Sequence, residues 1–164
     1  MVKVGDFSGY NEHCSPTAGT NLINYWGSCR GMTNLLKNNG TTMTNTQIFQ
    51  RLYTLMGTDA TGTARTKIVS GIKSYMNERS IFPQIAYSST GKLFFEQYIQ
   101  GINTNTPLIL SLDASTDHGY GNHSVFGVGY LGIYAIIIDG WSTGLTYINY
   151  DSLNLARYHH IGDF

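Results

Sequence analysis

Cys14 stands at the start of a segment that has the residue pattern of a helix. Ser15 followed by Pro16 is a common pair at the cap and the first turn of a helix. The free N–H groups and the dipole at a helix N-terminus stabilise an anion, so they lower the pKa of a thiol placed there. Cys14 is therefore a candidate nucleophile. The alternative is a small buried hydrophobic residue, as many free cysteines are, and His13 beside it either adds to the effect or points elsewhere.

Two residues that can carry proton chemistry stand beside predicted strands. His123 lies in GNHSVFGVGY, where a glycine-rich loop enters an apolar strand; a structural histidine held by a backbone carbonyl is the alternative. Asp139 ends the apolar run of YAIIIDGWSTG, where a carboxylate needs polar partners; the alternative is an Asp-Gly turn. Gly127 and Gly129 inside the first strand indicate a bulge or the close approach of another segment.

A β-hairpin relates the histidine to the aspartate. The strands predicted at 124–130 and 134–139 can pair through a turn at Leu131–Gly132. His123 and Asp139 are almost equally distant from that turn, so the pairing brings both to the same edge of the sheet. A helix-start cysteine, a histidine and a carboxylate together form the set required for nucleophilic acyl transfer. In that chemistry Cys14 attacks a carbonyl, His123 acts as base and acid, and Asp139 orients the ring.

The same three segments resemble the motifs of papain-like cysteine peptidases. HCSPTAGTNLINYW is similar to their nucleophile helix, GNHSVFGVGY to their histidine strand and IIIDGW to the segment of their third residue. The Asp-Gly-Trp form is most similar to the bacterial double-glycine leader peptidases and their free-standing relatives, although the stretch 28–105 matches no motif. The resemblance implies a peptide or protein substrate, no cofactor, and an active-site cleft between a helical half and a β half. It also implies that Trp141 shields the contact between His123 and Asp139.

The oxyanion hole departs from the family pattern. Papain-like enzymes usually place a glutamine a few residues before the cysteine, as the side-chain donor to the oxyanion. No glutamine stands between Met1 and Cys14. Asn11 is the nearest amide and is predicted to serve with the backbone N–H of Cys14. Ser8, with one hydroxyl donor, is the fallback.

Predicted helices fill the first part of the sequence and predicted strands the second part, and this segregation indicates an α+β fold. We expect one domain over residues 1–164, with a helical part at about 14–102 and an antiparallel β part at about 106–164. Cys29 is expected in the core, about 20 Å from Cys14 along the first helix and therefore too far away for a disulfide. The predicted helices are 15–27, 44–56, 63–77 and 91–102, and the predicted strands are 81–87, 108–112, 124–130, 134–139, 146–150 and 156–161.

Composition excludes several classes of protein. Ten basic residues balance ten acidic ones, and only 12% of the 164 residues are charged. We therefore expect no nucleic-acid partner and no polybasic attachment to a membrane. The uncharged polar surface suits a bacterial protein exposed outside the cell, and extracellular location is the expectation, although the first residues lack the apolar segment of a signal peptide. His118 with Asp113 and Asp117 could hold a metal, but solvated side chains are favoured and no metal is predicted.

Two further histidines stand near the end of the sequence. His159 and His160 alternate across the last predicted strand and are expected to have no part in the chemistry.

A cysteine peptidase is the first interpretation. An acyltransferase of the transglutaminase or arylamine type would use the same three residues with another acceptor. A catalytically weak or inactive binding module with the peptidase fold is the third, because the expected glutamine is missing.

Overall fold

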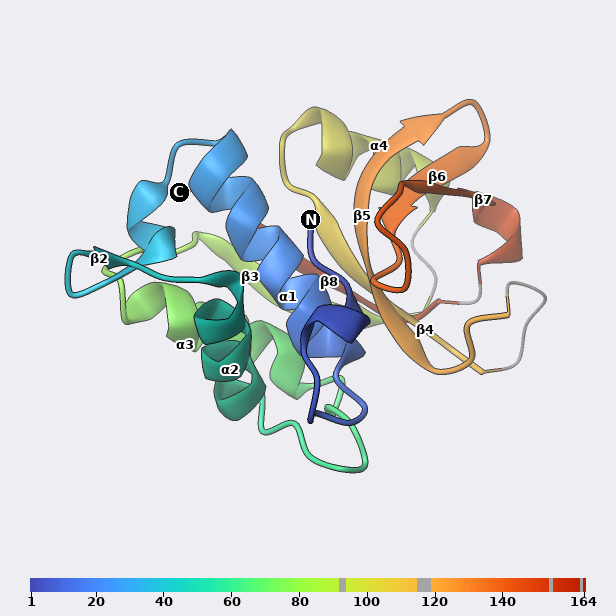
Figure 1. The fold of residues 1–164 in the computed structure, drawn as a ribbon. Helices are drawn as coiled ribbons and strands as arrows, with labels where there is room; N and C mark the ends of the chain where they lie inside the picture. Colours follow the sequence, from blue (N-terminus) through green and yellow to red (C-terminus); the bar gives the residue numbers. More distant parts are fainter. Residues whose placement is uncertain (92–93, 115–118, 154, 163) are drawn as a thin grey trace.

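The computed structural model describes residues 1–91, 94–114, 119–153, 155–162 and 164. Its centre is a six-stranded antiparallel sheet with the strand order β3-β8-β4-β5-β6-β7 (Figure 1). The strands are β3 (Ile85–Thr90), β4 (Leu108–Leu112), β5 (His123–Leu131), β6 (Tyr134–Ile138), β7 (Thr146–Asn149) and β8 (Leu155–Gly162), and a separate short pair is formed by β1 (Lys37–Asn38) and β2 (Thr41–Thr42).

Helices cover both faces of the sheet. The α-helices are α1 (Cys14–Asn24), α2 (Asn45–Leu55), α3 (Lys67–Asn77) and α4 (Phe95–Asn103), α1 continues into the π-helical turn η2 (Tyr25–Cys29), and short 3-10 turns are η1 (Val4–Asp6), η3 (Thr33–Leu36) and η4 (Tyr150–Ser152). The elements confirm the predicted α+β class. Within the described residues, no helix is both long and apolar enough to cross a bilayer.

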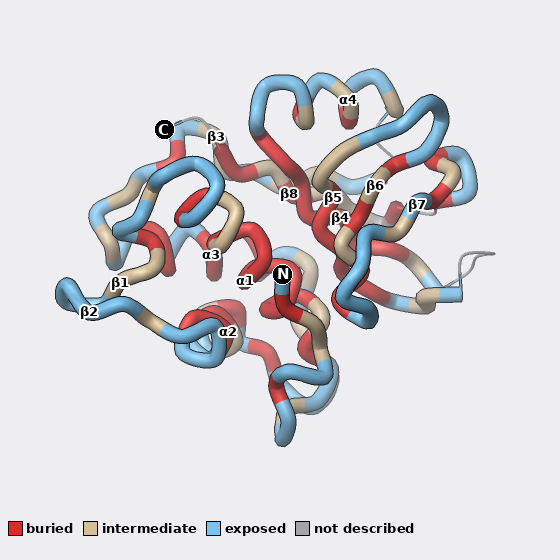
Figure 2. Tube along the Cα trace, turned by 45° about the horizontal axis from the view of Figure 1, so that its top comes forward, coloured by how far each residue is buried: buried red, intermediate tan, exposed pale blue. Residues whose placement is uncertain are grey.

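The alternation of β4 divides the core into two layers. Ile109 packs with α1, α2 and α3 on one face, whereas Leu108, Leu110 and Leu112 pack with Tyr98 of α4 on the other. All five residues of β4 are buried (Figure 2), and four of them are leucine or isoleucine. The buried hydroxyl of Ser111 lies 2.8 Å from Nε2 of His159. The helix-rich side carries α1, which is the element that positions the cysteine.

The first helix ends differently from the prediction. Ala18, Leu22 and Trp26 are buried as the helical spacing predicts. The turn η2 then widens to an i→i+5 pattern, in which the N–H of Arg30 donates to the carbonyl of Tyr25 at 3.1 Å. This winding departs from α-helical spacing, and Cys29 is exposed, so its predicted place in the core is wrong. Both cysteines are free, which confirms that they do not pair.

The helices α2 and α3 differ in how well their starts were predicted. Thr44 caps α2 with a capping box to Gln47, as the sequence position indicates. The helix α3 begins at Lys67, later than the predicted start at 63, because the preceding residues form a tight turn. In that turn the hydroxyls of Thr58 and Thr63 lie 2.7 Å apart, and Asp59 pairs with Gly62.

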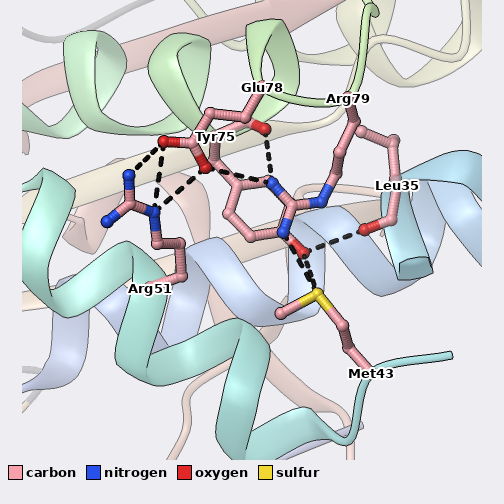
Figure 3. Close-up of polar contacts among 6 residues, drawn as sticks. All are labelled: Leu35, Met43, Arg51, Tyr75, Glu78 and Arg79. Atoms are coloured by element: carbon pink, nitrogen blue, oxygen red, sulfur yellow. Dashed lines mark hydrogen bonds and ion pairs between the residues drawn. The ribbon is translucent and has the colours of Figure 1, made fainter. Parts of the chain in front are cut away.

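A polar cluster fastens α2 and α3 to each other and to η3 (Figure 3). Arg51 of α2 forms an exposed ion pair with Glu78, just past the end of α3. The guanidinium of Arg79 lies 3.5 Å from the ring centroid of Tyr75 and donates to the Tyr75 carbonyl. The Tyr75 hydroxyl donates to the carbonyl of Leu35 at 2.9 Å. Because exposed ion pairs contribute little, the buried tyrosine is the main anchor of the cluster.

Candidate active site

Cys14 is the first residue of α1 and is half-buried. Its helix starts there because Pro16 fits the first turn, where no intrahelical N–H donor is needed. The Thr17 N–H donates to the carbonyl of His13, which closes that turn at 3.1 Å. The backbone N–H groups of Cys14 and Ser15 have no main-chain acceptor among the described residues. The cysteine therefore sits at the positive end of the helix dipole.

The predicted hairpin positions His123. The strands β5 and β6 pair antiparallel, with Leu131 opposite Tyr134, so the turn consists of Gly132 and Ile133, one residue later than expected. The register shifts between Gly127 and Gly129, which confirms the bulge that these glycines indicated. Phe126 pairs with Ile138, and the first residue of β5 therefore lies past the end of β6, beside the chain that leaves it.

The structure brings His123 and Asp139 together through an atom that the sequence did not indicate. His123 Nε2 lies 2.6 Å from the main-chain carbonyl oxygen of Asp139, and this oxygen accepts a hydrogen bond from the Nε2–H group. We expected the carboxylate to hold the ring. Because Nε2 makes this bond, the hydrogen bond between His123 and Cys14 is left to the other ring nitrogen, Nδ1.

The carboxylate of Asp139 instead organises the loop that follows β6. Its Oδ1 atom accepts from the backbone N–H groups of Trp141 and Ser142 at 2.9 and 3.0 Å. Its Oδ2 atom accepts from the hydroxyls of Tyr120 and Thr146, both at 3.1 Å. Burial raises the pKa of this carboxyl, but the hydrogen bonds outweigh burial and the pKa is lowered overall. The buried carboxylate is therefore ionised and fixes the loop that supplies the carbonyl for His123.

Cys14 and His123 form a pair whose pKa values shift in opposite directions. Burial raises the pKa of the Cys14 thiol, but the hydrogen bond and the charge of His123 outweigh burial and lower it. Burial lowers the pKa of His123, but the hydrogen bond and charge of Cys14 reverse that effect and raise it. Each partner thus stabilises the charged form of the other, which favours a thiolate beside an imidazolium.

Two serines support the sulfur, and sequence reasoning missed both. The backbone N–H of Ser124 and the side chain of Ser15 hydrogen-bond the sulfur and lower the pKa of Cys14 further. The hydroxyls of Ser15 and Ser124 also lie 2.9 Å apart in a buried position. The only available signal was their place next to Cys14 and His123 in the sequence. A strand that puts a histidine beside the sulfur also brings the following N–H close to it.

Aromatic rings cover the imidazole. The ring of Tyr120 stacks on His123 with centroids 5.5 Å apart and an interplanar angle of 9°. The ring of Trp141 lies 4.7 Å from the imidazole and is 53% exposed. Trp141 thus packs against the imidazole beside Asp139, and its shielding of the contact between His123 and Asp139 stays a prediction.

The other candidate residues lie elsewhere. Asn11 is exposed, and its side chain hydrogen-bonds no other described residue, so its role in the oxyanion hole stays a prediction. Ser8 is exposed as well. His13 points away from the sulfur, because its Nε2 atom lies 3.0 Å from the carbonyl oxygen of Val4. His118 and Asp117 lie outside the described residues, so the structure does not place the metal cluster considered with Asp113.

A cysteine at a helix N-terminus, paired with a histidine from an antiparallel sheet, is the arrangement of papain-like cysteine peptidases. Family comparison agrees over almost the whole chain. Residues 5–162 match the model of the Peptidase C39-like family, and the chain belongs to that family. No curated protein sequence matches the chain.

Solved structures confirm the fold. The peptidase domain of Streptococcus ComA, a bifunctional ABC transporter involved in a quorum-sensing pathway, has a TM-score of 0.62 at 14% identity, with 93% of each chain covered. A double-glycine-motif protease from an AMS/PCAT transporter, solved with the leader peptide, has a TM-score of 0.57 at 13% identity, covering 96% of this chain and 89% of that one. A chain described as a C39-like peptidase from Bacillus anthracis gives 0.57 at 14%, with 99% and 98% covered. These likenesses confirm the predicted papain-like fold.

Proposed function

We propose that this chain hydrolyses peptide bonds, with Cys14 as nucleophile, His123 as acid and base, and Asp139 as the residue that orients the imidazole. The family and fold are those of cysteine peptidases. The observation that carries the proposal is the hydrogen bond between Cys14 and His123, together with the lowered pKa of the thiol and the raised pKa of the ring. Such a pair supplies a thiolate at neutral pH without a separate deprotonation step.

The reaction follows from this geometry in two steps. The Cys14 sulfur attacks the scissile carbonyl carbon, and the proton on His123 Nδ1 passes to the amine as the C–N bond breaks. This leaves a thioester on Cys14 and a free amine. Water then attacks the thioester while His123 takes its proton, and the carboxylic acid leaves as the Cys14 thiolate forms again. The free N–H groups of Cys14 and Ser15 are the main-chain donors proposed for the oxyanion, with Asn11 as the proposed side-chain donor.

A peptide substrate is supported by a groove on the two elements that begin with the candidate catalytic residues, although Cys14 and His123 do not line it themselves. The helix α1 and the strand β5, which begin at Cys14 and His123, both line a groove of about 450 Å³. Among the described residues that line it, there are apolar side chains and uncharged amides but no charged side chain. They include Asn21, Tyr25, Cys29, Phe126, Val128 and Ile138. A neutral groove favours recognition through backbone hydrogen bonds and apolar side chains. The structural neighbour that was solved with a leader peptide supports the same class of substrate.

The test is cleavage of a mixed peptide library, with new termini identified by mass spectrometry. Cys14→Ala is expected to lower the rate by at least about 10³-fold, because it removes the nucleophile. Ser74→Ala is the control, since this exposed residue of α3 lines neither the groove nor the candidate catalytic pair. Equal activity of Cys14→Ala and the unchanged protein contradicts the proposal. Product formation only with an added amine acceptor favours the acyltransferase, and no turnover with an unreactive Cys14 favours the binding module.

A further inference from the structure

A large cavity lies on the face of the sheet that α4 covers, away from the candidate catalytic residues. Its volume is about 790 Å³, which is within the range of small-molecule sites. Its walls come from the end of α4, from β3 and β8 at one side of the sheet (Figure 2), and from the turn η2. We call it the aromatic cavity, and the lining residues used below are Trp26, Arg30, Tyr87, Tyr158 and His160.

Two buried ring nitrogens on these walls have no hydrogen-bond partner within the described part of the chain. They are Nε1 of Trp26 and Nε2 of His160. Trp26 is only 6% exposed, and an indole N–H can only donate. Native proteins leave few buried polar groups unsatisfied, because each one costs stability. Two such nitrogens on one cavity wall therefore point to a ligand that carries hydrogen-bond acceptors.

The charges on the walls indicate the sign of that ligand. Arg30 is exposed at the cavity and forms no ion pair with any residue that the structure describes. The described lining residues include no aspartate or glutamate. Burial lowers the pKa of His160, so its ring is neutral at pH 7. The Tyr87 hydroxyl lies 3.3 Å from Nδ1 of this ring, and donation by the hydroxyl leaves the ring proton on Nε2.

The residues of the cavity wall pack closely around Trp26. A Cβ atom on Gly162 would lie 2.5 Å from Cγ2 of Thr106 and 3.5 Å from the Trp26 ring. The glycine therefore allows the indole and Thr106 to pack against the end of β8. The π-helical turn η2 holds Trp26 and ends at the residue before Arg30, and such turns are frequent at functional sites.

We propose that the aromatic cavity binds a small aromatic carboxylate. The ring of the ligand packs against Tyr87 and Tyr158, which project from neighbouring strands. The carboxylate accepts hydrogen bonds from Trp26 Nε1 and His160 Nε2, and Arg30 supplies the opposite charge. This site is separate from the proposed peptidase activity and does not depend on it.

The test uses 3-phenylpropionate as the probe and 3-phenylpropylamine as its cationic counterpart. Both are titrated into ¹⁵N-labelled Cys14→Ala protein, and the two indole N–H signals are followed by NMR. Trp26→Phe and Trp141→Phe assign those signals. The carboxylate is expected to produce a saturable shift of the Trp26 signal while the Trp141 signal stays unmoved. The amine is expected to shift neither.

Variants of Arg30 and His160 test whether these residues bind the carboxylate of the probe. Arg30→Glu is expected to weaken binding by at least about tenfold, because it removes a charge-assisted hydrogen bond and adds repulsion. Lys67→Glu makes the same change of charge at an exposed position outside the cavity and is expected to leave binding unchanged. His160→Phe keeps a ring but loses the donor, and weaker binding is again expected. A shift that does not saturate, equal binding of the amine, or equal loss in Arg30→Glu and Lys67→Glu overturns the proposal.

Discussion

The imidazole of His123 is held by the main-chain carbonyl of Asp139 at 2.6 Å, while the carboxylate of the same residue turns to the loop behind it. That carboxylate accepts backbone N–H bonds from Trp141 and Ser142 and hydroxyl bonds from Ser142, Tyr120 and Thr146. The side chain of Asp139 therefore acts on the histidine mainly through the shape of its own loop. Mutation of Asp139 can therefore remove the negative charge without removing the carbonyl that holds His123. A direct carboxylate–imidazole bond would combine the loss of charge with the loss of orientation.

Asp139→Asn is expected to retain kcat/KM within about tenfold of the unchanged protein. The amide oxygen can still accept from the N–H groups of Trp141 and Ser142, and the backbone carbonyl that holds His123 is unchanged. The negative charge of Asp139 is one cause of the raised pKa of His123, so its loss lowers that pKa. The alkaline limb of the pH–rate profile should then move to lower pH, since the imidazolium is lost earlier.

Asp139→Ala is the contrasting variant, because it removes every side-chain acceptor of the loop. It is expected to lower kcat/KM by more than about a hundredfold, the range of general acid–base catalysis, as the carbonyl loses its fixed position. A loss of about 10⁴-fold already in Asp139→Asn would instead assign a direct role to the carboxylate. Steady-state kinetics of both variants on one peptide distinguish these cases.

Alkylation by iodoacetamide measures the thiolate on Cys14. Because its pKa is lowered, the thiolate fraction rises at lower pH than for an ordinary thiol, and the labelling rate follows. His123→Ala removes the hydrogen bond and charge that lower this pKa. The midpoint of the labelling profile should move to higher pH, and the rate at pH 6.5 should fall by about tenfold, equal to one pKa unit.

Peptide mapping across pH 4 to 9 separates the two cysteines in the same sample. The exposed Cys29 is the internal comparison, and its labelling should be the same with and without His123. A Cys14 profile that His123→Ala leaves unchanged would show that the ring does not stabilise the thiolate.

The sequence predicted elements whose signals are local. The β character of residues 108–112 predicted the bounds of β4, and the helical pattern from Thr44 predicted the start of α2. The hairpin placed His123 near Asp139 because pairing between adjacent strands depends on one short turn. The insertion of β8 between β3 and β4 was not predicted, since it depends on contacts between segments far apart in the sequence.

Atomic detail in the sites was beyond sequence reasoning for the same physical reason. No pattern of residue types distinguishes the carbonyl of Asp139 from its carboxylate as the partner of His123. The winding of η2 exposed Cys29 although helical spacing placed it in the core. His160 was expected to have no role, and only the folded chain brings it to the same cavity as Trp26.

Gly127→Ala is expected to destabilise the protein by about 1–3 kcal/mol, the usual effect of overpacking. A Cβ at this position would lie 2.8 Å from the ring and hydroxyl of Tyr98. Tyr98 cannot move easily, because it is fully buried and its hydroxyl donates to the carbonyl of Gly129 at 2.9 Å. Urea unfolding measures the change, with Gly144→Ala as control because a Cβ there meets nothing within 4 Å. Equal stability of the two variants would contradict the close packing of Tyr98 on β5.

Trp141→Ala tests whether the indole protects the bond between His123 and the Asp139 carbonyl. The ring lies 4.7 Å from the imidazole, so its removal admits water to a hydrogen bond that is now partly shielded. We expect kcat to fall by about tenfold, comparable to one pKa unit in proton-transfer energy, with a smaller change in the free energy of unfolding because Trp141 is half-exposed. Trp141→Phe retains an aromatic cover and should recover most of the rate. If alanine and phenylalanine lower kcat equally, the ring does not act as a cover, and the indole N–H must be tested as a contact for the substrate.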